Sequence, residues 1–286
     1  MSHHKKTQEL LEAAKSILEA SESPMTVRQT YYQLVTKNLI ENCKESYSKI
    51  SRILGDGRKE GEIAWELIED RVRTPWKVNT WDCLTNYFET VKRAYRKDLW
   101  EKQNSYIEVS VEKDALSGIF SDVLSYYQVT LNVGRGYDSL SSLKNMADRL
   151  IAQKEAGKTC YILSFGDFDP SGEDIFRALY QGLENFRSPA TCKRCAILQE
   201  DITNYNLPPN VAKSSDARYS GFINKNGSCD AVELDALPGN ILKQRIKDEV
   251  EACIIDKKSW DESITEQKEQ TKWMQTNIQK IINKLK

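Results

Sequence analysis

Apolar and polar residues alternate with the period of an α-helix along the first part of the chain. Leucine, isoleucine and alanine recur at helical spacing over residues 7–20, and a second run follows a capping residue, Thr26, to about Lys37. A third run spans about residues 43–58, and an extended basic stretch continues to residue 77. Three short helices followed by a small extended element predict a winged-helix DNA-binding domain over residues 1–78.

The pattern changes after a charged helix, predicted over residues 79–104, that would link this domain to the next. Short apolar runs then alternate with helical ones, which predicts βαβ units, a mostly parallel sheet and an α/β domain over residues 105–257. Residues 205–229 lack a clear period and are expected to form a loop, and residues 258–286 to form a charged helix. The expected strands are 106–111, 129–133, 159–165, 194–198 and 230–234, and the expected helices are 113–127, 139–156, 172–185 and 239–255.

Composition restricts the possible catalytic residues more than it restricts the possible binding partners. The 286 residues include 41 basic and 42 acidic ones, so any DNA-binding surface must be local. Seven scattered cysteines and the lack of a long apolar run favour a cytoplasmic or nucleoid-associated protein (nuclear if eukaryotic) with no membrane contact. The pair Cys192 and Cys195 is interpreted as structural rather than as half of a zinc site. The only histidines are His3 and His4, which excludes a catalytic histidine in the body of the chain.

Two aspartates follow the apolar run of residues 159–165. Asp167 and Asp169 lie where a strand ends and a helix begins, at the edge where α/β sheets bind ligands. No lysine or arginine follows closely before Arg177, so a cation between the two carboxylates would relieve their repulsion. Oxygen ligands of this kind suit Mg²⁺. In the alternative interpretation, Asp169 caps the helix and Asp167 is solvated.

Further acidic residues follow other predicted strands. Glu112 ends the strand 106–111, so a parallel sheet would place it beside Asp167 and Asp169 in a Mg²⁺ or Mn²⁺ site for phosphoryl transfer. Alternatively, Glu112 is an acid favoured by the first turn of a helix. Glu233 and Asp235 could add a ligand, but capping of the helix after Pro238 is the favoured interpretation.

These motifs resemble the Toprim domain. The sequence VEKDAL at 111–116 supplies the acid after a first strand, and GDFDPSG at 166–172 supplies the DxD pair after a later one, with a βα unit between them. The resemblance covers about residues 105–255. It implies metal-dependent action on nucleic-acid phosphodiesters, as in topoisomerases, primases and related nucleases.

The second predicted helix carries two neighbouring tyrosines. Tyr31 lies on its apolar face and is expected in the core, whereas Arg28 and Tyr32 share a neighbouring face. An arginine one turn from a tyrosine can bind phosphate and favour the phenolate, although a tyrosine on an amphipathic helix is more often a packing residue.

Together with the downstream motifs, the helix sequence RQTYY resembles the A subunit of topoisomerase VI and the related meiotic double-strand-break protein, especially short stand-alone members. This resemblance implies that Tyr32 is the nucleophile, that Arg28 assists it, and that Glu112, Asp167 and Asp169 hold the metal. It also implies a homodimer, in which the tyrosine of one copy meets the metal of the other. The chain has no phosphate-binding glycine loop, so strand passage would need a separate ATPase subunit.

Three functions therefore remain open. The first is a DNA transesterase that forms a phosphotyrosyl link, the second a Toprim nuclease that uses metal-activated water, and the third a DNA-binding protein without catalysis. Each would use double-stranded DNA as its partner, although each basic residue could also belong to a solvated surface. The candidate DNA-binding residues are Lys49, Arg52, Arg58, Arg71, Arg73 and Arg135.

Overall fold

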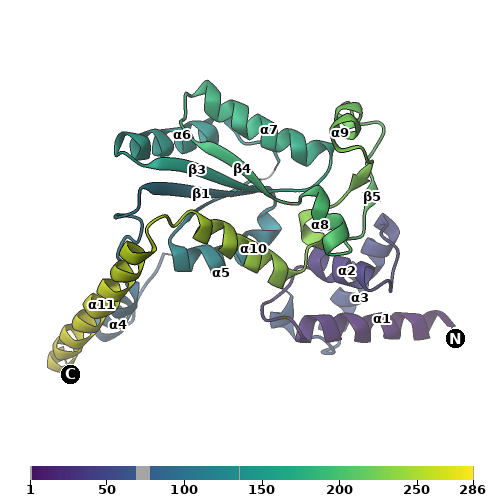
Figure 1. The fold of residues 1–286 in the computed structure, drawn as a ribbon. Helices are drawn as coiled ribbons and strands as arrows, with labels where there is room; N and C mark the ends of the chain where they lie inside the picture. The colour runs from purple at the N-terminus through teal and green to yellow at the C-terminus, as the bar shows by residue number, and fades with distance from the viewer. Residues whose placement is uncertain (1, 69–77, 135, 286) are drawn as a thin grey trace.

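The computed structural model describes residues 2–68, 78–134 and 136–285, and it begins with the three expected helices (Figure 1). They are α1 (Ser2–Glu19), α2 (Val27–Thr36) and α3 (Lys44–Lys59). The start of α2 is fixed by a capping box, in which Thr26 Oγ1 accepts from Gln29 N at 3.2 Å and Gln29 Oε1 accepts from Thr26 N at 2.8 Å. The cap predicted at Thr26 is confirmed.

The connection from these helices departs from the prediction. A short 3₁₀ turn, η1 (Trp65–Leu67), follows α3, and the rest of the expected basic element, residues 69–77, lies outside the described residues. The expected linker helix is shorter than predicted, because α4 (Leu84–Ala94) ends well before residue 102. Beyond it, the Lys97 backbone N–H donates to the Gln267 side chain at 2.8 Å instead of continuing a helix.

Four parallel strands form the main sheet, which confirms the expected α/β class. They are β1 (Ser105–Val111), β2 (Thr130–Val133), β3 (Thr159–Phe165) and β4 (Thr191–Ala196), in the order β2-β1-β3-β4. Val111 of β1 is in register with Phe165 of β3, so these two central strands end at the same level. Glu112 and the segment that begins at Gly166 therefore leave the sheet side by side.

Helices cover both faces of this sheet (Figure 1). One face packs against η2 (Asp114–Leu116), α5 (Ser117–Tyr127) and α10 (Gly239–Ala252), and the other against α6 (Leu140–Glu155) and α7 (Pro170–Asn185). Alternation along β3 explains the two layers, because Leu163 and Phe165 enter the first core and Ile162 enters the second. The apolar cluster of the first face continues into the N-terminal helices.

The segment after β4 (191–196, not the predicted 194–198) differs most from expectation. Residues 230–234 do not form a strand of the main sheet, because β5 (Asn210–Val211) and β6 (Asp230–Ala231) pair with each other in antiparallel fashion. The expected loop also contains α9 (Tyr219–Asn226), after α8 (Gln199–Asn204). Val232 instead pairs with Phe168 through two backbone hydrogen bonds of 2.8 Å, which brings this segment against the loop after β3.

The last helix, α11 (Lys257–Leu285), runs beside α4 away from the sheet (Figure 1). Lys92 Nζ donates to Gln279 Oε1 at 2.8 Å between the two helices. Within the described parts of the chain, no helix combines the length and the apolar character needed to cross a membrane.

Candidate functional site

The acidic edge of the sheet forms where β1 and β3 end. The Glu112 N–H donates to the Phe165 carbonyl at 3.0 Å, and Glu112 Oε2 accepts from the Asp167 N–H at 2.9 Å. Glu112 is therefore not only an acid favoured by a helix start, because it binds the loop that carries the two aspartates. Burial raises the pKa of Glu112.

Two glycines make this close packing possible. A Cβ atom at Gly166 would lie 2.6 Å from Glu112 Oε2, and one at Gly172 would lie 2.2 Å from the Asp167 carbonyl oxygen. Both distances are far below van der Waals contact. The motif GDFDPSG thus needs glycine at both positions to bring Glu112 against the loop.

The two aspartates of the motif have different environments. Asp169 Oδ1 accepts from the Gly172 N–H at 2.7 Å and caps α7, with Pro170 in the first turn, as the capping interpretation predicted. The idea that Asp167 is solvated was wrong, because this residue is only 7% exposed. Asp167 Oδ1 accepts from the Leu234 N–H at 2.8 Å, and its Oδ2 lies 3.0 Å from Lys113 Nζ. Burial raises the pKa of Asp167 to about 7, and Lys113 opposes that rise.

Two cations that are distant in sequence stabilise this loop. The expectation that no lysine or arginine lies near the two aspartates was therefore wrong for the folded chain. One is Lys113. The other is Arg194 on β4, which donates to the carbonyls of Gly166 at 3.2 Å and Gly172 at 3.3 Å and also to that of Asp167. Burial lowers the pKa of Arg194. No local pattern in the sequence pointed to either residue, although Lys113 directly follows Glu112.

Lys113 joins three carboxylates. Its Nζ lies 3.0 Å from Asp167 Oδ2, 2.6 Å from Glu233 Oε2 and 3.0 Å from Asp235 Oδ2. Burial alone would lower the pKa of Lys113, but the three carboxylates outweigh it and raise the pKa. The favoured capping role of Glu233 and Asp235 was wrong, since α10 begins after Pro238 without a side-chain cap. Asp235 lies instead in the short turn η3 (Leu234–Ala236), which packs against α2, and Glu233 directly precedes it.

The tyrosine helix meets this cluster from the other side. Arg28 donates to Glu233 Oε2, and its Nε lies 3.7 Å from Asp235 Oδ2. The Tyr32 hydroxyl interacts electrostatically with the Glu233 carboxylate. Burial and Glu233 raise the pKa of Tyr32, while Arg28 and Lys113 oppose the rise.

Tyr31 lies in the core, as predicted. It is 3% exposed, and its hydroxyl donates to Asn42 Oδ1 at 3.0 Å and to the Cys43 carbonyl at 3.2 Å. These partners belong to the loop before α3, whereas Tyr32 interacts electrostatically with Glu233. The two neighbouring tyrosines thus have separate environments.

One chain therefore brings together most of the predicted site. Arg28 and Tyr32 reach Asp167 through Glu233 and Lys113, and Glu112 contacts the Asp167 backbone. Asp169 lies in the same loop, but its side chain caps α7. The residues that complete the connection, Lys113 and Glu233, come from segments 120 positions apart in the sequence.

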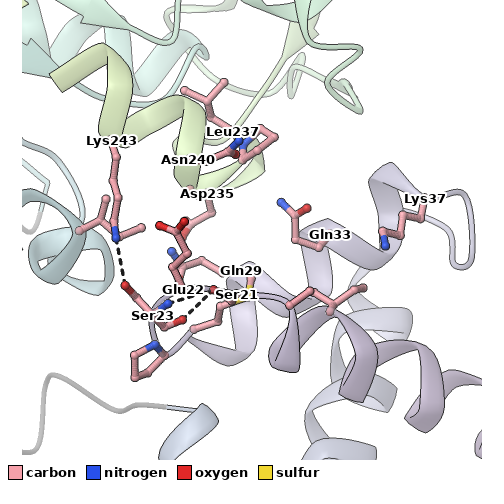
Figure 2. Close-up of a pocket in the computed structure, with 17 residues that line it drawn as sticks. Ser21, Glu22, Ser23, Gln29, Gln33, Lys37, Asp235, Leu237, Asn240 and Lys243 are labelled. Carbon is pink, nitrogen blue, oxygen red and sulfur yellow. Dashed lines mark hydrogen bonds between the residues drawn. The ribbon is translucent and has the colours of Figure 1, made fainter. Parts of the chain in front are cut away.

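A cavity of about 410 Å³ lies beside this cluster, between the N-terminal helices and the start of α10 (Figure 2). Asp235 lines it, together with Gln29 and Gln33 of α2 and with Leu237 and Asn240. Among the described residues, Asp235 Oδ1 has no hydrogen-bond partner, although its Oδ2 contacts Lys113. The contact between α2 and the α/β domain is therefore an ion pair at Glu233, and the cavity lies directly beside it.

The carboxylate oxygens of the acidic edge suit a divalent cation, but in this structure these side chains are engaged in contacts with other parts of the chain. Glu112, Asp167 and Asp169 offer the hard oxygen atoms that Mg²⁺ prefers. In the part of the chain that the structure describes, no three His, Cys, Asp or Glu side chains are arranged to hold a metal ion. The Lys113 ammonium lies against Asp167, so metal binding there would require Asp167 to exchange partners. Cys192 and Cys195 are free thiols on β4, and burial raises the pKa of both.

The predicted DNA-binding residues are only partly described. Lys49 and Arg52 lie on α3, and the Arg52 side chain is exposed. Arg58 instead donates to the carbonyls of Trp65 and Ile68, both at 3.3 Å, and its guanidinium lies 4.3 Å from the centre of the Trp65 ring. Arg71, Arg73 and Arg135 lie outside the described residues.

Comparison with known proteins adds no assignment. No family model, no curated protein and no solved structure matches this chain.

Proposed function

We propose that this protein cleaves double-stranded DNA in a metal-dependent transesterification in which Tyr32 is the nucleophile. Residues 1–78 would act as a winged-helix domain and residues 105–257 as a Toprim domain. The observation that carries the proposal is the position of Glu233. Its carboxylate accepts hydrogen bonds from Arg28 and Lys113 and interacts electrostatically with Tyr32, and Lys113 Nζ also lies 3.0 Å from Asp167 Oδ2. The tyrosine and the acidic edge therefore lie next to each other within one chain, whereas the resemblance places the tyrosine of one copy at the metal of the other.

The chemistry requires that Tyr32 lose its proton. The Tyr32 oxygen would form a bond to phosphorus while the bond to one deoxyribose oxygen breaks, and that oxygen would leave with a proton. Glu233 disfavours the phenolate in the DNA-free chain by raising the pKa of Tyr32. Arg28 and Lys113 favour the phenolate, so an exchange of Glu233 for DNA phosphate would bring both cations to the reacting group.

Glu112, Asp167 and Asp169 are the residues that would hold Mg²⁺ or Mn²⁺. When bound, the ion would offset negative charge on the phosphate and on the leaving oxygen. Arg194 would keep the loop in place, since its guanidinium donates to the carbonyls on both sides of Asp169 in the sequence.

The partners follow from the same proposal. Lys49 and Arg52 on α3 would contact the DNA backbone. Double-strand cleavage would use two copies of the chain, one for each strand, and strand passage would need a separate ATPase subunit.

A nuclease that uses metal-activated water is the second candidate, and one observation favours it. Tyr32 is only 4% exposed, and burial and Glu233 raise its pKa, so its hydroxyl is a poor nucleophile in this conformation. In that case the acidic edge would act alone and Tyr32 would be structural.

Cleavage of supercoiled plasmid separates the two candidates. Purified protein is incubated with plasmid and Mg²⁺ or Mn²⁺ and stopped with detergent, and half of each sample is then digested with protease. The proposal predicts ends that enter the gel only after protease treatment and that vanish in Tyr32→Phe and in Asp167→Asn. Tyr31→Phe is the matched control, because it removes a buried hydroxyl that is not part of the cluster. Free ends that persist in Tyr32→Phe would instead establish the nuclease.

A further inference from the structure

Glu233 is bound in the way that an enzyme binds a phosphate group. Lys113 Nζ donates to its Oε2 at 2.6 Å, Arg28 donates to the same oxygen, and the Tyr32 hydroxyl interacts electrostatically with the carboxylate. An ammonium, a guanidinium and a hydroxyl that converge on one anion form a set that suits a phosphodiester, which carries the same single negative charge.

We propose that Glu233 is an internal mimic of the DNA phosphate: its carboxylate occupies the site of the phosphodiester and competes with DNA for Arg28 and Lys113. This inference rests on the proposed function for the identity of the ligand. It adds Lys113 as a phosphate-binding residue and Glu233 as a built-in inhibitor.

The three acids around Lys113 differ in their freedom to leave it. The Asp235 side chain is 0% exposed, and that of Asp167 is 10% exposed and also accepts from the Leu234 N–H. The Glu233 side chain is 25% exposed and precedes η3 without capping it. Glu233 is therefore the acid that can turn into solvent without leaving a buried carboxylate unpaired.

The exposure of Arg28 and the charges of the cluster both favour an exchange of Glu233 for DNA phosphate. The Arg28 side chain is 44% exposed, so a DNA backbone can reach its guanidinium. Two cations, Arg28 and Lys113, face the carboxylates of Glu233 and Asp235 and that of Asp167, whose pKa of about 7 leaves it partly ionised at neutral pH, so negative charge is in excess while Glu233 is in place. With Glu233 turned away, this excess of negative charge is gone, and the positions on Arg28 and Lys113 that Glu233 occupied become available to phosphate, while Lys113 keeps its contacts with Asp167 and Asp235.

Binding of a short duplex DNA without divalent metal tests the proposal. Fluorescence anisotropy of a labelled duplex in EDTA compares wild type with Glu233→Gln, which keeps the size of the side chain and removes its charge. We expect Glu233→Gln to bind about tenfold more tightly, equivalent to about 1.4 kcal/mol. The matched control is Glu249→Gln, which also removes a carboxylate bonded to a lysine (Lys193, 2.5 Å) but lies on α10 outside the cluster. It should change binding by less than about twofold.

A double variant identifies the residues responsible. If Lys113 binds the phosphate, Lys113→Met in the Glu233→Gln background should abolish the tenfold gain. Inorganic pyrophosphate should compete with DNA more effectively for Glu233→Gln than for wild type. Glu233→Ala provides a second test of the same effect if the amide itself binds DNA.

The outcomes also separate this inference from the proposed reaction. Tighter DNA binding by Glu233→Gln, with no protein–DNA adduct from any variant, would support the phosphate site and refute the transesterase. Equal or weaker binding by both Glu233 variants, while wild type still forms adducts, would refute the mimic and leave the transesterase in place. A gain that survives Lys113→Met would also refute the assigned site.

Discussion

Replacing Lys113 by methionine should destabilise the protein strongly, because one cation holds three carboxylates at the contact between the N-terminal helices and the sheet. The Lys113 side chain is 18% exposed, and that of Asp235 is 0% exposed. Methionine keeps most of the length of the side chain but leaves Asp167, Glu233 and Asp235 without the ammonium. Removal of one partner from a buried ion pair typically costs about 3–5 kcal/mol.

Urea unfolding followed by circular dichroism measures this loss at pH 7. Lys144→Met is the matched control, since Lys144 pairs with Asp148 on α6 and both side chains are about half exposed. That surface pair should contribute less than about 1 kcal/mol. The difference between the two variants isolates the effect of burial from the effect of losing a lysine.

The loss should depend on pH in a defined direction. Without Lys113, Glu233 and Asp167 take up protons more readily, so the variant recovers stability relative to wild type as the pH falls. If Lys113→Met lowers the free energy of unfolding no more than Lys144→Met at pH 7, the cluster does not hold the two parts together and the reasoning fails.

Three further predictions concern single side chains. Between about pH 4.5 and 2, wild type should lose stability as Glu233 is protonated, because burial raises its pKa but Lys113 and Arg28 outweigh burial and lower it to about 2. In Glu233→Gln, the free energy of unfolding, measured with urea at each pH, should fall by about 2–3 kcal/mol less over this pH range. A fall as large as that of wild type would contradict the assignment. Gly172→Ala should cost more than about 2 kcal/mol in thermal unfolding, because its Cβ would lie 2.2 Å from a backbone oxygen, whereas Gly55→Ala in open space on α3 should be neutral or stabilising. Arg194→Lys should lower the melting temperature and reduce metal-dependent cleavage, because an ammonium cannot replace the planar donors that hold the loop; full cleavage by this variant would show that the loop needs no such support.

Local patterns predicted the elements that depend on neighbours in sequence. The period of apolar residues and the cap at Thr26 located α2, and the βα alternation gave a parallel sheet with Glu112 and Asp167 at one edge. These features follow from hydrogen bonds and burial within short segments. Residues 230–234 were wrongly expected to form a strand of the sheet, because Val232 is buried in the core while its backbone pairs with Phe168 instead of with a strand of the sheet.

The connections within the site could not be predicted in the same way. Lys113 and Glu233 meet across 120 positions, and Arg194 reaches the aspartate loop from another strand. Such contacts depend on how helices and strands pack, and no local period records them. Asp167 was expected to need a metal ion for its charge, yet Lys113 already lies 3.0 Å from it.

The most direct test of transesterification is to identify the residue that carries DNA. Adducts formed with Mg²⁺ or Mn²⁺ are digested with nuclease and trypsin, and the peptide of residues 29–37, which contains both Tyr31 and Tyr32, is fragmented in a mass spectrometer. The proposal predicts a nucleotide mass on Tyr32 and none on Tyr31. DNA cleavage with an unmodified peptide, or a nucleotide on Tyr31, would contradict the proposal that Tyr32 is the nucleophile.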